Sequence, residues 1–316
     1  MGLKATRPTG VLTLGSLTSD CITGWACYNA TIASPDVIEN ISSTGAILAI
    51  RRTNQSPVNG MIFAIGGHAG SGWWDHGTPL ARAWEDRMIA AGYDIVQYRH
   101  LGYGWPDALL YRQGFLRLGC RPATAIRWVH DNWFRGGRYM VMGSSEGSAA
   151  IGYAMAMYGI DSIVRRIAYI SGPPMTDLVD ACLAVNGDQL AHPSESGLCD
   201  EPDGFQVMVN GYGPCTLRIA SPFDINWWQK NSVETADDRF IGGQTIGNYV
   251  YPNTRVGFII GDHDSGSIHF HAQKLIDKFG QVGQPITVLN VPTMGHIITT
   301  SQDGLNTLFD FLISSP

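Results

Sequence analysis

The sequence has few charged residues and no basic run, which limits the partners that this protein can have. Charged residues make up 15% of the 316 positions, and the formal net charge is -6 at pH 7. Proteins that bind a nucleic-acid backbone normally carry clustered lysine and arginine, so we expect no nucleic-acid partner. No apolar stretch approaches the roughly 18 residues that a transmembrane helix requires, so we expect no membrane span. A hydrophobic content of 44% is ample for a globular core.

The cysteines lack the spacing of a metal site. None of the six forms a Cys-x-x-C pair, and no histidine cluster at zinc-site spacing accompanies them. Cys21 and Cys27 are close enough in sequence to close a small loop, and three others share one glycine- and proline-rich segment. This distribution favours disulfides and an oxidising compartment, with buried thiols as the alternative. The six are Cys21, Cys27, Cys120, Cys182, Cys199 and Cys215.

The N-terminal residues give no independent evidence on localisation. Residues 1–7 lack the long apolar region of a signal peptide, and they look like the start of a trimmed chain. The expected localisation therefore depends on the cysteines, whose distribution favours a secreted or periplasmic protein. No haem, flavin or nicotinamide motif is present, so no cofactor is expected.

Apolar runs alternate with helical patterns along most of the chain. Residues 60–65 are apolar without polar alternation, which is typical of a strand covered on both faces. Helix 79–91 is expected to bury one face, with Leu80, Trp84, Met88 and Ala91. The alternation predicts an α/β fold, with a mostly parallel sheet covered by helices on both faces. Expected strands are 27–32, 45–51, 60–65, 93–98, 138–142, 164–171, 255–260 and 286–291; expected helices are 79–91, 122–134, 148–157, 270–279 and 303–313.

Residues 174–251 do not follow this alternation. The segment is long, and it concentrates cysteines, glycines and the pair Trp227-Trp228. Long irregular insertions in compact domains are usually functional. We therefore expect a single domain over residues 1–316, in which residues 174–251 form a cap over the active site.

A Gly-x-Ser-x-Gly sequence at residues 143–147 places Ser145 between an expected strand and an expected helix. In that setting the pattern marks a sharp turn that presents the serine as a nucleophile. The turn is strained, so a β-carbon at Gly143 or Gly147 is expected to collide with the neighbouring strand or helix. The N-terminus of the helix adds partial positive charge where negative charge would develop.

A serine hydroxyl needs a base to accept its proton and an acid to orient that base. In chains with this turn the order is serine, acid, histidine. His296 follows the last expected strand in a glycine-containing loop, so it is the predicted base. Two candidate acids, Asp262 and Asp264, follow the strand that ends at residue 260. The nearby histidines His263, His269 and His271 offer a metal site with these aspartates as the alternative. For His269 and His271, ordinary polar roles at the start of a helix are expected instead.

A glycine-rich segment at residues 66–74 follows another buried strand. Glycine lets the backbone approach a substrate, so N–H groups of this segment are predicted to stabilise an oxyanion. The expected donors are the backbone of His68 or Ala69 together with that of Glu146. The alternative is a turn that binds nothing. A phosphate-binding loop is excluded because the Gly-Lys-Ser/Thr ending is missing.

Together these segments resemble the α/β-hydrolase superfamily over roughly residues 45–316. In that superfamily the acid usually follows a Gly-x-x-Asp pattern, which implies Asp264 as the acid and a structural role for Asp262. The sequence departs from the superfamily where Gly66-Gly67 replaces the usual His-Gly and where the strand before Arg99-His100 lacks the common aspartate. The residues that flank Ser145 assign no subfamily.

The resemblance and the serine together predict a carboxylic ester hydrolase that acts through an acyl-enzyme on a small-molecule or polymeric ester. Dehalogenases and epoxide hydrolases of this fold use an aspartate where Ser145 stands, so the serine argues against both. The alternatives are a serine peptidase or amidase and a non-catalytic binding protein. Five tryptophans are candidates for an apolar substrate pocket, with core positions as the alternative: Trp73, Trp74, Trp105, Trp227 and Trp228.

Overall fold

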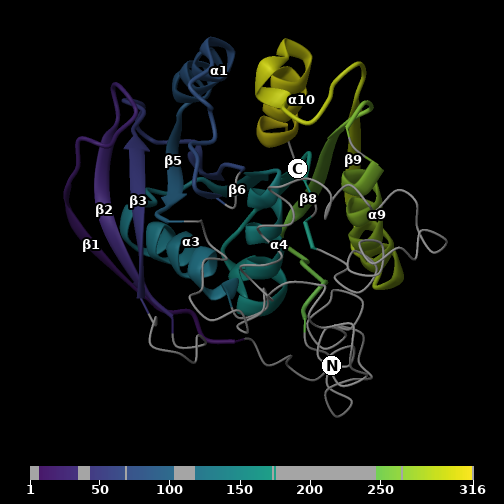
Figure 1. Ribbon diagram of the computed structural model, residues 1–316, viewed down its shortest axis with the longest axis horizontal. Coiled ribbons are helices and arrows are strands. Elements are labelled where there is room, and N and C mark those ends of the chain that lie inside the picture. The colour runs from purple at the N-terminus through teal and green to yellow at the C-terminus, as the bar shows by residue number, and fades with distance from the viewer. Residues whose placement is uncertain are drawn as a thin grey trace.

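The computed structural model describes residues 7–34, 43–67, 70–102, 118–172, 174–175, 247–264 and 266–314. These residues form a nine-stranded sheet with helices on both faces (Figure 1). The strands are β1 (Val11–Leu17), β2 (Ala26–Ala33), β3 (Ser43–Arg51), β4 (Gly60–Ile65), β5 (Tyr93–His100), β6 (Arg138–Ser144), β7 (Arg166–Ile170), β8 (Arg255–Gly261) and β9 (Ile286–Val291). The helices are α1 (Pro79–Ala90), α3 (Cys120–Trp133), α4 (Glu146–Tyr158), α9 (Gly266–Gln281) and α10 (Gln302–Ile313).

The sheet is mostly parallel, as the sequence predicts. Its strand order is β1-β2-β3-β5-β4-β6-β7-β8-β9, and all neighbours from β5 to β9 pair in parallel. The first three strands add antiparallel pairs at one side. Because the carboxyl ends of parallel strands meet at one edge, the loops after β4, β6, β8 and β9 gather there.

Side chains alternate between two cores along the central strands. In β4, Met61 and Phe63 pack into one core with α3, α4 and α9, while Ile62 and Ala64 pack into the other with α1 and α10. Figure 1 shows α1 and α10 together on one side of the sheet and α3 and α4 on the other. Both faces are therefore covered, which explains the continuous apolar runs of the strands.

The buried face of α1 differs from the expected one. Ala81, Trp84 and Met88 are buried, but Leu80 is 38% exposed, so the prediction that Leu80 faces the core was wrong. Glu85 is buried instead, at 1% exposure. A carboxyl can take such a position only with polar partners, and those partners are described below.

The structure adds β1, which the sequence analysis missed. Most of its residues are exposed, Val11 at 67% and Leu17 at 66%, because β1 is an edge strand with one neighbour. Of the proposed cap, residues 176–246 lie outside the described residues, and so do Cys182, Cys199 and Cys215. None of the helices built from the described residues is long and apolar enough to cross a membrane.

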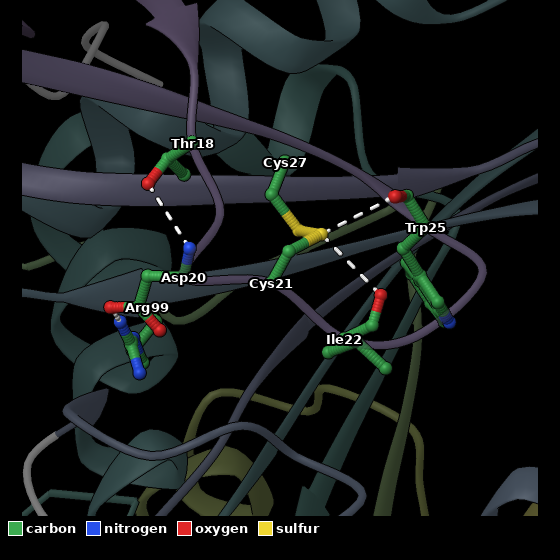
Figure 2. Close-up of a disulfide and its surroundings, with 7 residues drawn as sticks. All are labelled: Thr18, Asp20, Cys21, Ile22, Trp25, Cys27 and Arg99. Carbon is green, nitrogen blue, oxygen red and sulfur yellow. Dashed lines mark hydrogen bonds and ion pairs between the residues drawn. A yellow bond between two sulfur atoms is a disulfide. The ribbon is translucent and has the colours of Figure 1, made fainter.

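A disulfide joins Cys21 to Cys27, as their spacing suggests (Figure 2). It closes the connection between β1 and β2 on itself. Asp20, in the same connection, forms an ion pair with Arg99 of β5. The guanidinium of Arg99 also lies 4.8 Å from the ring centroid of Trp73, so the connection is tied to the segment that follows β4.

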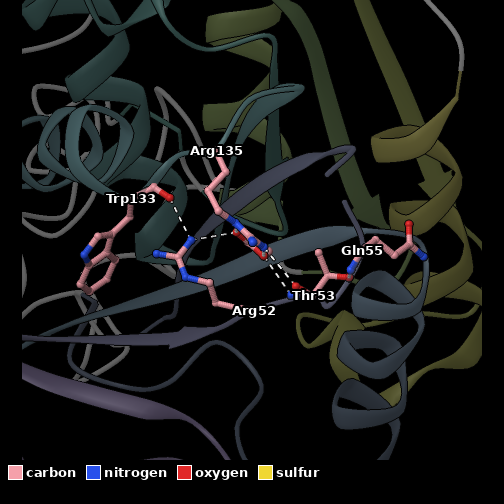
Figure 3. Close-up of polar contacts among 6 residues, drawn as sticks. Arg52, Thr53, Gln55, Trp133 and Arg135 are labelled. Carbon is pink, nitrogen blue, oxygen red and sulfur yellow. Dashed lines mark hydrogen bonds and ion pairs between the residues drawn. The ribbon is translucent and has the colours of Figure 1, made fainter. Parts of the chain in front are cut away.

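A buried carboxylate ties together the side of the sheet at which the parallel strands begin. The side chain of Asp94, at the start of β5, is 1% exposed. It accepts hydrogen bonds from Arg52 at 3.0 Å, from Arg135 at 2.6 Å and from the backbone N–H of Thr53 at 2.9 Å. Figure 3 shows Arg52 and Arg135 approaching each other from two sides. Asp94 thereby links the ends of β3 and α3 to β5.

Candidate active site

Ser145 sits in a strained turn between β6 and α4. Its φ is 53° and its ψ is -128°, a conformation that residues with a side chain rarely adopt. The backbone holds it there, because the N–H of Ser145 donates to the carbonyl of Ile170 at 2.9 Å and its carbonyl accepts from Ser148 at 2.8 Å. The turn therefore points this side chain away from the regular path of the chain.

The glycines around Ser145 leave no room for a side chain. A β-carbon at Gly143 would lie 2.3 Å from the carbonyl oxygen of Gly147, and one at Gly147 would lie 2.6 Å from the carbonyl oxygen of Ile65. The prediction of these two collisions is confirmed. A β-carbon at Gly172, which the sequence analysis did not single out, would lie 2.0 Å from the carbonyl oxygen of Ser145.

Ser148 braces the turn from inside the protein. Its hydroxyl is fully buried, donates to the carbonyl of Gly143 at 2.7 Å and accepts from the N–H of Ile170 at 3.1 Å. It thus connects the strand before Ser145 to β7. Sequence reasoning missed this role, although Ser148 directly precedes the run of small and apolar residues 149–157.

His296 bridges Ser145 and Asp264. Its Nε2 lies 2.8 Å from the Oγ of Ser145, and its Nδ1 lies 3.0 Å from the Oδ1 of Asp264. The side chain of Asp264 is buried, whereas that of His296 is 42% exposed. A carboxylate can only accept, so Nδ1 carries the proton and Nε2 is left to accept one from the serine hydroxyl.

The loops that carry the acid and the histidine are paired through their backbones. The N–H of His263 donates to the carbonyl of Met294 at 2.7 Å, and that of Asp262 donates to Val291 at 3.1 Å. A β-carbon at Gly261 would lie 2.4 Å from the carbonyl oxygen of Met294. The absence of a side chain at Gly261 thus lets the histidine loop pack close to the end of β8.

The other polar residues near Asp264 that the structure describes are not gathered around one point. Asp262 and His263 are exposed, and the Nε2 of His269 lies 3.1 Å from the carbonyl of Gly261. The side chain of His271 lies outside the described residues. Within the described part of the chain, no group of three or more His, Cys, Asp or Glu side chains could hold a metal ion.

The glycine-rich segment after β4 lies beside Ser145. A β-carbon at Gly67 would lie 3.2 Å from the Cβ of Ser145, and one at Gly66 would lie 2.5 Å from the carbonyl oxygen of Gly72. The segment therefore folds back on itself next to the serine. Two of the predicted oxyanion donors, His68 and Ala69, are outside the described residues. The third, Glu146, is the first residue of α4, whose N-terminal end carries partial positive charge.

Of the five candidate pocket tryptophans, the structure describes Trp73 and Trp74, and these two lie in different surroundings. Trp73 is half-buried beneath Arg99. Trp74 is 1% exposed and packs in the core, with its ring centroid 4.9 Å from that of Trp84. Trp74 therefore takes the core position that was the alternative to a pocket role. Trp105, Trp227 and Trp228 lie outside the described residues.

Comparisons with known proteins bear on the fold of this chain. No protein-family model matches the chain, and no curated protein sequence does. Among solved structures, lipase A of Candida antarctica in its closed state is 13% identical, with a TM-score of 0.55, over 94% of this chain and 79% of that one. A thermostable carboxyl esterase from Bacillus coagulans, in complex with glycerol, is 12% identical, with a TM-score of 0.50, over 86% and 93%.

A candidate dipeptidyl aminopeptidase IV from Bacteroides ovatus is also similar, at 13% identity and a TM-score of 0.52. The alignment covers 92% of this chain but 36% of that protein, so this chain spans about a third of its length. At identities this low, structural likeness shows the fold alone. Together with the mostly parallel sheet and its helices, these likenesses establish that the chain has the α/β-hydrolase fold.

Proposed function

We propose that this protein is a serine hydrolase that cleaves carboxylic esters through an acyl-enzyme. The observation that carries the proposal is the continuous chain of contacts from Ser145 to His296, at 2.8 Å, and from His296 to Asp264, at 3.0 Å. Each member has the chemistry that its place requires: a hydroxyl, an imidazole and a buried carboxylate.

In the proposed mechanism, His296 takes the hydroxyl proton as Ser145 Oγ attacks the ester carbonyl. Asp264 holds the imidazole in its orientation and stabilises the imidazolium that forms. His296 then gives the proton to the departing alkoxide, which leaves an acyl group on Ser145. Water, activated by His296, attacks the acyl-enzyme and releases the acid.

The negative charge of the tetrahedral intermediates requires fixed hydrogen-bond donors. We assign this task to the backbone N–H of His68 or Ala69 and to that of Glu146. The closeness of Gly67 to Ser145 and the position of Glu146 at the start of α4 support the assignment. Neither donor requires a side chain, so the site depends on the course of the backbone.

Esters are favoured over amides because an alkoxide needs less protonation to depart than an amine does. Likeness to a lipase and a carboxyl esterase supports this choice, whereas likeness to the candidate aminopeptidase keeps a serine peptidase as the second candidate. We further propose that residues 174–251 form a cap over the site, in a single domain. The Cys21–Cys27 disulfide supports a secreted or periplasmic location.

The test is labelling with a fluorophosphonate probe, followed by peptide mapping, alongside turnover of an ester panel and of matched amides. We expect the label on Ser145, its loss in His296→Ala, and faster turnover of esters. Labelling of Ser145 with faster turnover of amides would make the protein a peptidase or amidase. Absence of labelling in folded protein, both as it stands and with the cap segment shortened, would reject the triad.

A further inference from the structure

A buried glutamine connects the segment beside Ser145 to helix α1. Gln97, in β5, is 1% exposed. Its Oε1 accepts a hydrogen bond from the backbone N–H of Trp74 at 2.8 Å, and its Nε2 donates to Oε1 of Glu85 at 2.6 Å. Trp74 and Glu85 are each also 1% exposed. The whole connection therefore lies in the protein interior, on the same face of the sheet as α1.

The chemistry of the partners fixes the direction of each hydrogen bond. The backbone N–H of Trp74 can only donate, so the oxygen of the Gln97 amide must face it. The amide nitrogen then faces Glu85, which has to present an accepting oxygen. An apolar residue at position 97 would leave a buried N–H and a buried carboxyl without partners, which is costly in the interior.

Glu85 can hold this place because its neutral form is favoured. Burial, and secondarily the nearby charge of Asp75, raise the pKa of Glu85 to about 8. The charged groups around it come from three elements: Asp75 in the turn before α1, Arg51 in β3, and Arg82 and Asp86 in α1. At neutral pH the carboxyl is therefore protonated, and its carbonyl oxygen accepts from Gln97.

Trp74 closes the segment that begins at Gly66. The start of that segment is fixed by β4, whose last residue, Ile65, pairs with Gly143 of β6. Its end is fixed at Trp74 by Gln97, and between them Gly67 approaches Ser145. After Trp74, Asp75 continues the anchorage, because its Oδ1 accepts from the N–H of Gly77 at 3.2 Å and its carbonyl accepts from Thr78.

We propose that Gln97 and Glu85 are positioning residues, which hold the described backbone of this segment, residues 66–67 and 70–74, in its place beside Ser145 and so support oxyanion stabilisation. This inference rests on the proposed function. Neither side chain touches the substrate, so the effect of each is transmitted through the backbone of Trp74. A shift of about 1 Å in such a segment is enough to lower the rate roughly 100-fold.

The first test compares Gln97→Leu with Gln284→Leu. Gln284 is a matched control, because it is also buried and its Oε1 accepts a backbone N–H, that of Tyr251, at 2.6 Å. It lies just before β9, on the side of the sheet at which the parallel strands begin, whereas Ser145 lies on the side at which they end. We expect Gln97→Leu to lower kcat by about 10-fold to 100-fold with little change in KM, while Gln284→Leu lowers only the Tm.

Hydrogen exchange provides a readout that does not depend on activity. Peptides covering residues 66–74 should exchange faster in Gln97→Leu than in the wild type and in Gln284→Leu. The exchanged pair Glu85→Gln with Gln97→Glu tests the direction of the bonds, because a carboxyl at position 97 can accept from Trp74 and from a donating amide at position 85. The double variant should recover most of the kcat that Gln97→Leu loses.

The pH profile tests Glu85 itself. Above about pH 8, ionisation of Glu85 introduces a buried charge beside Asp75, so the wild-type kcat should fall. Glu85→Gln keeps the accepting oxygen but cannot ionise, so its kcat should persist at alkaline pH. Identical alkaline limbs in the two proteins, or unchanged exchange of residues 66–74 in Gln97→Leu, would overturn the inference while leaving an active esterase. A wild type that neither labels nor turns over would reject the proposed function, and this inference with it.

Discussion

Gly261 lies against the carbonyl oxygen of Met294, to which an added β-carbon would come within 2.4 Å. The contact sets how closely the loop that carries His296 approaches the loop that carries Asp264. Both loops leave the carboxyl ends of neighbouring parallel strands, β9 and β8, so a small change at Gly261 is transmitted directly to the histidine.

We expect Gly261→Ala to lower kcat about 100-fold, because the added methyl group pushes the histidine loop away from Asp264. The measurement is esterase kinetics together with a thermal melt. Gly280→Ala is the control, since a β-carbon at Gly280, in α9, meets no atom within 4 Å. A Gly261→Ala protein with full activity would show that the loop can yield without cost.

The two aspartates after β8 should differ sharply in effect. Asp264→Asn is expected to lower kcat about 10⁴-fold, because an amide can donate to Nδ1 of His296 and stabilise the wrong tautomer. Asp262→Asn changes an exposed side chain and should leave kcat within a few-fold of the wild type. The reverse order of effects would transfer the role of the acid to Asp262.

The carboxylate of Asp94 should contribute to stability and not to catalysis. Asp94→Asn removes the charge that Arg52 and Arg135 share, which should destabilise the fold by about 3 kcal/mol. Asp86→Asn breaks an ion pair with Arg51 whose aspartate is 63% exposed, so it should destabilise by less than about 1 kcal/mol. Chemical denaturation measures both, and equal losses would contradict the distinction.

Glu85 should also leave a signature in the pH dependence of stability. The pKa of Glu85 is about 8 in the folded protein, against 4.5 as the ordinary value, so the unfolded chain releases this proton first as the pH rises. Glu85 therefore reduces stability progressively between about pH 4.5 and pH 8. Glu85→Gln should match the wild-type Tm near pH 4 and exceed it by a growing margin up to pH 8. A constant difference in Tm over that range would rule out the raised pKa.

The arrangement of the candidate site could be predicted from the sequence because its chemistry follows strand ends. Ser145 and Asp264 each follow a buried apolar strand, His296 follows the last strand, and parallel topology brings such strand ends to one edge. The collisions at Gly143 and Gly147 could also be predicted, because the strand and the helix approach each other closely at such a turn and leave no room for a β-carbon.

Other features could not be predicted because they depend on contacts between distant segments. Glu85 lies in a stretch that reads as the polar side of a helix, and only the position of Gln97 across the core makes its burial favourable. The pattern of apolar residues predicts Leu80 on the buried face of α1. In the structure Glu85 lies on that face and Leu80 is exposed. The strand β1 has too few buried residues to show a clear period, because it pairs on one side alone.

The positive φ of Ser145 has a consequence for evolution and engineering. A non-glycine residue in such a conformation carries a strain of about 1–3 kcal/mol, which the surrounding fold must offset. Glycine would relieve that strain, so the residue with the best local geometry at position 145 is one without a nucleophile. Selection for thermal stability alone would favour the loss of the hydroxyl, and only selection for turnover would retain it.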